Sequence, residues 1–128
     1  MNDIEFLNKF DRCLISWDDW NHYSHIRMAY LFLTKYGNID GQSKIINGIK
    51  KFNKFHSAKK MKIGYHETIT LFWINQIRFR LIKNNNSFNE FKLQNQELFK
   101  YDYIYNFYDK EVLYSDNAKL KFIKPNRV

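Results

Sequence analysis

The feature that most constrains this chain of 128 residues is how little in it would interrupt a helix. Proline occurs once, at position 125, and glycine occurs at positions 37, 41, 48 and 64. Both residue types disfavour helix interiors, so most of the chain is free to form helices without a break. Only Gly48 falls inside a predicted helix, where we expect it to allow close packing.

Apolar side chains recur every three to four residues along most of the chain, which places them on one face of a helix. The first such stripe is Ile4, Leu7, Phe10 and Leu14. Predicted helices cover residues 3–14, 18–36 (capped by Asp18 or Asp19), 43–55 and 65–83, with further caps at Ser87 and Ser115 and a helical or irregular segment at 101–114. Residues 55–64 are expected to form a basic loop. The predicted fold class is all-α, with residues 1–128 forming a single domain, a bundle of about five or six helices.

Composition excludes several classes of protein. Apolar residues make up 45% and aromatic residues 19%, which is too much for a disordered chain. No stretch of about 18 uncharged apolar residues exists, so no transmembrane helix is expected. One cysteine excludes an intramolecular disulfide and a cysteine-rich metal site. The N-terminus is acidic and amphipathic, so we expect no cleavable signal and a cytoplasmic location.

The positive charge of the chain is concentrated in one stretch. The net charge is +8, and seven lysines occur without an acidic residue among them, at positions 44, 50, 51, 54, 59, 60 and 62. Two interpretations stay open: a solvated helix face in a chain whose composition follows AT-rich codons, or a 44–62 surface for an anionic partner. Only five of the basic residues are arginine, so nucleic acid binding is not expected.

Three of the four histidines continue apolar helical stripes. His22 and His25 are three residues apart and share a helix face, while His66 begins the inward stripe of the 65–83 helix. If the two helices pack together, the three imidazoles meet at one end of the bundle. Three imidazoles and an open position form a catalytic zinc site, so we predict that these residues bind a divalent metal, zinc or iron. His56 lies in the basic loop and is expected to be exposed.

Two other interpretations of the histidines stay open. In a metal-free site, His66 would act as general acid or base, oriented by Glu67. Alternatively, the histidines are structural and form hydrogen bonds inside the core. The zinc-protease pattern His-Glu-x-x-His is broken, because residue 70 is threonine. Contacts to a cofactor or small-molecule ligand are expected from Asn53, Thr70, Trp20 and Arg78.

Three short segments form a recognisable set of motifs. Residues 20–29 read Trp-Asn-His-Tyr-Ser-His-Ile-Arg-Met-Ala, residues 49–53 read Ile-Lys-Lys-Phe-Asn, and residues 64–70 read Gly-Tyr-His-Glu-Thr-Ile-Thr. Together they resemble a family of small bacterial helical proteins with W-x-H-x-x-H and G-Y-H-E-T-x-T motifs, whose function is unknown. The resemblance covers most of residues 17–125. It implies no particular activity, but it groups as one set His22, His25, Asn53, His66, Glu67 and Thr70.

Overall fold

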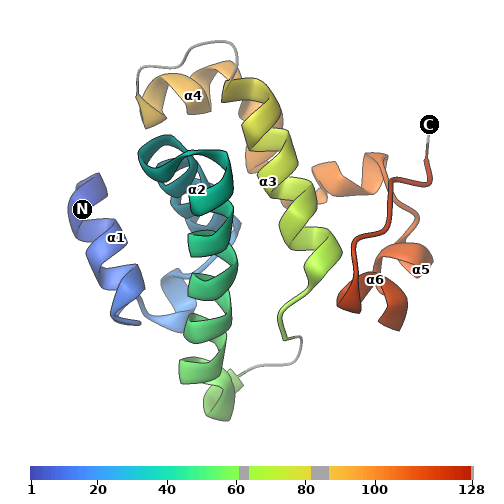
Figure 1. Cartoon of the computed structure of the whole chain (residues 1–128), viewed down its shortest axis with the longest axis horizontal. Coiled ribbons are helices and arrows are strands. Elements are labelled where there is room, and N and C mark those ends of the chain that lie inside the picture. Colours follow the sequence, from blue (N-terminus) through green and yellow to red (C-terminus); the bar gives the residue numbers. More distant parts are fainter. Residues whose placement is uncertain (61–63, 82–86, 128) are drawn as a thin grey trace. The chain divides into compact units, whose positions relative to one another are not determined.

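The computed structural model describes residues 1–60, 64–81 and 87–127, with the backbone alone for residues 57–60 (Figure 1). The chain is 77% helical, and the described residues contain no strand, so the predicted all-α class is confirmed. None of the described helices is both long enough and apolar enough to cross a membrane. The chain divides into two compact units, Met1–Gly64 (the first unit) and Tyr65–Val128 (the second unit). A single domain over residues 1–128 stays a prediction.

The first unit begins with α1 (Asp3–Asp11), which lies against the helix that follows it (Figure 1). Asn2 caps its N-terminus. The Asn2 side chain accepts a hydrogen bond from the backbone N–H of Glu5 at 2.8 Å and donates one to the Glu5 carboxylate at 2.9 Å. This reciprocal pair satisfies a backbone N–H that the first turn of a helix leaves without a partner.

The buried face of α1 differs from the predicted stripe. Phe6 is buried, whereas Ile4 is 74% exposed and Leu14 is 56% exposed. The helix ends before Leu14, because the chain turns at Cys13 with a φ of 57°, in the left-handed region. The predicted extension of the helix to residue 14 is therefore wrong, and Leu14 does not share its face.

The start of the next helix is capped by Asn21 rather than by the predicted aspartates, which lie in the short helical turn η1 (Trp17–Asp19). The backbone N–H of Ser24 donates to the Asn21 side chain at 3.1 Å. The Ser24 hydroxyl also donates to the carbonyl oxygen of Asp19 at 2.8 Å. These bonds fix Trp20 between the turn and the helix.

The longest element, α2 (His22–Lys60), consists of two helical arms joined at Gly37. Gly37 has a φ of 83°, a conformation that glycine adopts without steric cost. The arms approach so closely that a Cβ on Gly41 would lie 2.8 Å from the carbonyl oxygen of Phe32. The predicted stop at Gly37 is confirmed as a break in the helix. The predicted loop from residue 55 is wrong, because the second arm continues to Lys60.

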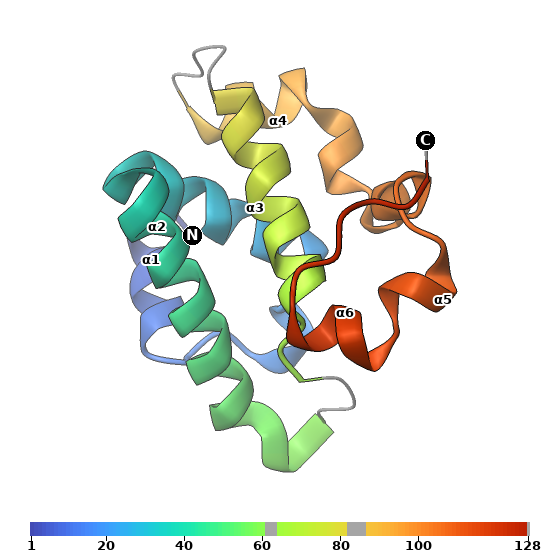
Figure 2. The ribbon, with the colours of Figure 1, turned by 45° about the vertical axis from the view of Figure 1, so that its right-hand side comes forward.

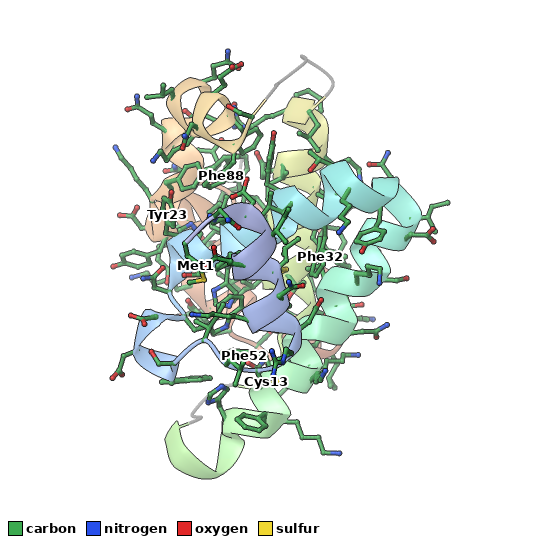
Figure 3. All side chains as sticks on the ribbon, turned by 90° about the vertical axis from the view of Figure 1, so that its left-hand side faces the viewer. Met1, Cys13, Tyr23, Phe32, Phe52 and Phe88 are labelled. Carbon is green, nitrogen blue, oxygen red and sulfur yellow. The ribbon has the colours of Figure 1, made fainter. Side chains whose placement is uncertain are left out.

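Aromatic rings fill the core of the first unit. The Phe10 ring centroid lies 4.9 Å from that of Trp20, 6.0 Å from that of Phe32 and 5.7 Å from that of Phe52. Figure 3 labels Phe32 and Phe52, which come from the two arms of α2. A Cβ on Gly48 would lie 2.6 Å from the Phe10 ring, so the close packing predicted at this glycine is confirmed.

The second unit contains one longer helix and several short ones. In chain order these are α3 (Glu67–Leu81), α4 (Phe88–Gln94), η2 (Gln96–Phe99), η3 (Tyr101–Asn106), α5 (Lys110–Leu113) and α6 (Asp116–Leu120). The predicted caps at Ser87 and Ser115 are confirmed, since each side chain accepts a hydrogen bond from the backbone N–H three residues later. The predicted end of the 65–83 helix lies outside the described residues.

The core of the second unit forms where α3 packs against residues 104–113. It consists of the buried residues Phe72, Ile104, Tyr108 and Leu113. Helix α6 packs against α3, and Figure 2 shows the C-terminal segment beside the same helix. The start of α3, which carries the Gly-Tyr-His-Glu-Thr-Ile-Thr motif, is therefore part of this core.

Candidate functional site

His66, a predicted metal ligand and catalytic residue, uses both ring nitrogens inside the second unit. Its Nε2 lies 2.8 Å from the carbonyl oxygen of Leu113, and its Nδ1 accepts the backbone N–H of Ile69 at 3.1 Å. Because a carbonyl only accepts and an amide N–H only donates, His66 is neutral with its proton on Nε2. Burial lowers the pKa of His66, and the charge of Lys119 lowers it further. The ring links α3 to α5 and has no free lone pair.

Thr68 has a similar structural role, which the sequence did not single out. Its buried hydroxyl has one proton, which is shared between the carbonyl oxygens of Ala118 at 2.6 Å and Lys121 at 2.9 Å. It also accepts the backbone N–H of Ile123 at 3.1 Å. One side chain thus holds the end of α6 and the segment after it against α3.

The Glu67 carboxylate forms a hydrogen bond with Tyr65 rather than with His66. The Tyr65 hydroxyl donates to a Glu67 carboxylate oxygen at 2.5 Å. Burial raises the pKa of Tyr65, and Glu67 raises it further, while a hydrogen bond with the Thr70 side chain opposes the shift. The nitrogens of His66 contact other groups, so the structure does not bring His66 and Glu67 together as the predicted acid–base pair.

The other predicted ligand contacts are divided between the two units. Asn53 is partly buried on the second arm of α2. Arg78 is partly buried on α3, where its guanidinium donates to the Asn75 side chain at 3.0 Å. Trp20 belongs to the first unit and Thr70 to the second. A shared role for these four residues stays a prediction.

The first unit contains a dense group of rings, which we call the histidine–aromatic cluster: Trp17, Trp20, His25, Phe52 and His56. Ring centroids lie 4.2 Å apart for Trp20 and His25, 4.7 Å for Trp20 and Phe52, and 4.3 Å for Phe52 and His56. The Trp17 centroid lies 5.8 Å from that of His56. The cluster joins η1, the residue that follows η1, and both arms of α2.

The prediction that His56 is exposed in a loop is wrong. His56 is only 8% exposed and lies on the second arm of α2, which continues past the predicted helix end. Ile45, Ile49 and Phe52 are buried on the same arm, and His56 follows at the same spacing of three or four residues. That spacing is the sequence signal that identifies His56 as a core position.

Two buried nitrogens of the cluster lack hydrogen bonds. Trp20 Nε1 and His56 Nε2 are both buried, and neither has a hydrogen-bond partner in the part of the chain that the structure describes. A buried polar atom left without a partner costs about 1–3 kcal/mol. Most buried polar atoms in native proteins are paired, so two unpaired ones in one cluster call for an explanation.

His25 supplies a third ring nitrogen to the cluster, and this nitrogen is a hydrogen-bond acceptor. Its Nδ1 lies 2.8 Å from the carbonyl oxygen of Asn21, so Nδ1 carries the proton and Nε2 is an acceptor. Burial lowers the pKa of His25 to about 4, and the nearby His22 adds to the shift. At neutral pH the cluster therefore contains an uncharged imidazole beside the unpartnered indole.

The predicted metal site has no support from these contacts. In the described residues no three His, Cys, Asp or Glu side chains are grouped so that they could hold a metal ion. His22 and His25 lie in the first unit, whereas His66 lies in the second and uses both of its nitrogens. The convergence of the three histidines on zinc or iron stays a prediction.

Two lysines of the basic stretch have local roles. The Lys51 ammonium donates to the carbonyl oxygen of Asp11 at 2.6 Å, which satisfies an end group of α1. The Lys44 ammonium lies 4.5 Å from the centroid of the Tyr36 ring. The side chains of residues 59 and 60, and residue 62 as a whole, lie outside the described residues. The 44–62 surface for an anionic partner stays a prediction.

Comparison with known proteins finds no similar one. No protein family matches the chain, and no curated protein or solved structure matches it. The resemblance to bacterial proteins with the W-x-H-x-x-H and G-Y-H-E-T-x-T motifs stays a prediction. Any functional proposal therefore rests on the contacts within the two units.

Proposed function

We propose that this is a binding protein whose site for a small molecule is the histidine–aromatic cluster. The observation that carries the proposal is the pair of buried, unpartnered nitrogens, Trp20 Nε1 and His56 Nε2. An indole N–H can only donate a hydrogen bond, so the atom that satisfies it must be an acceptor. A metal cation cannot take that place, and we therefore propose a molecule with an acceptor oxygen or nitrogen.

The protonation state of His25 favours binding over acid–base catalysis. A general base works best when its pKa lies near the operating pH. Because burial lowers the pKa of His25 to about 4, this imidazole is a weak base at neutral pH. It is suited to accept a hydrogen bond from a ligand without taking the proton. The cytoplasm is the proposed location, since the single cysteine is free and buried, which suits a reducing compartment.

The test is to identify what the protein carries. Protein purified without an affinity tag is denatured, and the released small molecules are measured by mass spectrometry. Trp20→Phe keeps an aromatic ring and removes the unpartnered N–H. Trp73→Phe makes the same change in the second unit, outside the cluster, at a side chain that is only partly buried, and is the matched control.

We expect a bound molecule in the wild type and in Trp73→Phe, and its loss from Trp20→Phe. A second readout is the indole N–H resonance of Trp20, which should shift when the native protein is stripped of its ligand. The proposal fails if no molecule is released from the wild type and a metabolite extract leaves this resonance unchanged. It also fails if Trp20→Phe retains the molecule.

A further inference from the structure

Hydrogen-bond complementarity restricts which molecules suit the cluster. Trp20 Nε1 is an unpartnered donor. The neighbouring His25 offers an acceptor at Nε2, because its Nδ1 proton is directed to the carbonyl oxygen of Asn21. The ring centroids of Trp20 and His25 are 4.2 Å apart, so the two rings are direct neighbours, and we consider a ligand group that contacts both. That group needs an acceptor for the indole and a donor for the imidazole.

The ring neighbours of Trp20 and His56 are uncharged. The rings within stacking distance of Trp20 are those of Phe10, His25 and Phe52. The rings packed around His56 are those of Trp17, Phe52 and Phe55. None of these side chains carries a charge at neutral pH, His25 included. A charged ligand placed among them would lose hydration without gaining an opposite charge.

Two cationic side chains of the first unit, Lys51 and Arg27, form contacts outside the cluster. Lys51 donates to the carbonyl oxygen of Asp11 at 2.6 Å. Arg27 forms an ion pair with Asp3 at 2.8 Å and also donates to the carbonyl oxygen of Met1. Neither cation faces the cluster in these contacts, and a carboxylate buried there without an opposite charge would cost several kcal/mol.

We infer that the cluster selects an uncharged amide, whose carbonyl accepts from Trp20 and whose N–H donates to His25. This inference rests on the proposed function and specifies its ligand class. A carboxylate of the same shape has two acceptor oxygens and no donor. One of those oxygens would face the His25 Nε2 lone pair, so the geometry opposes binding of the acid even before desolvation is counted.

The test compares matched pairs of probes on the full-length, ligand-stripped protein at neutral pH. Benzamide and benzoate share a ring and differ in one group, and acetamide and acetate are a smaller pair. Binding is followed through the Trp20 indole N–H resonance and the His25 ring-nitrogen resonances. We expect at least one amide to shift both sets and to bind about tenfold or more tightly than its acid. Trp20→Phe should lose the preference, and Trp73→Phe, in the second unit, should keep it.

Three outcomes overturn the amide assignment. In the first, an acid binds as tightly as its amide. In the second, an amide shifts Trp20 while the His25 ring nitrogens stay unchanged. In the third, no probe shifts Trp20. Each of these leaves the proposed binding function to be decided separately by the released-molecule measurement, in which a bound carboxylic acid would support binding and contradict the amide class.

Discussion

Two histidines of this protein are buried to the same extent and have opposite hydrogen-bonding states. His66 in the second unit is 7% exposed and uses both ring nitrogens, whereas His56 in the first unit is 8% exposed and has an unpartnered Nε2. Burial therefore does not distinguish a structural histidine from a candidate ligand-binding one. For these two histidines, unmet hydrogen-bonding capacity does, and it distinguishes His56 from His66.

The difference follows from where each ring lies on its helix. His66 precedes the first turn of α3, where backbone N–H groups lack partners within the helix, so its Nδ1 accepts the N–H of Ile69. His56 lies inside the second arm of α2, where backbone groups are already paired along the helix. Its ring neighbours are Trp17, Phe52 and Phe55, and no group in the described part of the chain forms a hydrogen bond with its Nε2.

The largest expected effect is at Thr68, where the second unit depends on one hydroxyl. Thr68→Val keeps the shape of the side chain but leaves two carbonyl oxygens and one N–H without their partner. We expect a loss of about 3 kcal/mol in the free energy of unfolding, measured by denaturant titration. Thr70→Val, at a partly buried position of the same helix, is the control and should cost less than about 1 kcal/mol. Equal losses would contradict the assigned role.

The next effect tests whether His66 is structural. His66→Phe keeps a ring and removes both hydrogen bonds, so we expect a loss of about 2 kcal/mol in the free energy of unfolding. Hydrogen exchange should accelerate around the end of α5, where Leu113 loses its bond. The content of bound metal and small molecules should stay as in the wild type. Loss of a metal from this variant would instead support the three-histidine site.

The pH dependence of stability provides a third test, in the first unit. The pKa of His25 is lowered from 6.5 to about 4 by burial, so the unfolded chain takes up the proton first as the pH falls. The stabilisation is complete above about pH 6.5 and is lost progressively towards pH 4. Allowing for solvent screening at this partly exposed ring, we expect a loss of about 1.5 kcal/mol. His25→Gln should flatten this slope, and an unchanged slope would contradict the assignment.

Sequence reasoning succeeded where the cause is local. A serine with a glutamate three residues later identified the cap at Ser87, and the breaker at Gly37 identified the bend in α2. Sequence reasoning was wrong where a neighbouring residue, rather than the predicted one, capped or ended a helix. Asn21 replaced the predicted aspartates as the cap, and a left-handed Cys13 ended α1 before Leu14.

The hydrogen bonds of the candidate sites could not be predicted in the same way. The acceptor for His66 Nε2 is 47 residues away in the chain, and the partners of the Thr68 hydroxyl are 50 to 55 residues away. Helical spacing shows that His66 is buried but gives no information about the backbone that faces it. The unpartnered state of His56 is likewise a property of the packed rings around it.

The smallest stability effect is the sharpest test of the comparison between the two histidines. His56→Phe replaces one buried ring by another and removes an unpartnered polar atom. Replacing such an atom with an apolar group is close to neutral, so we expect the free energy of unfolding to stay within about 1 kcal/mol of the wild type. The matched change at His66 should cost about 2 kcal/mol at almost the same exposure, 7% against 8%.

The binding readout of the same variants should reverse that order. His56→Phe should reduce the amount of small molecule that the purified protein releases, while His66→Phe should leave it unchanged. If His56→Phe instead destabilises the protein as much as His66→Phe does, the nitrogen of His56 has a structural partner in solution. The cluster would then lose one of its two unpartnered groups, and the binding proposal would depend on Trp20 alone.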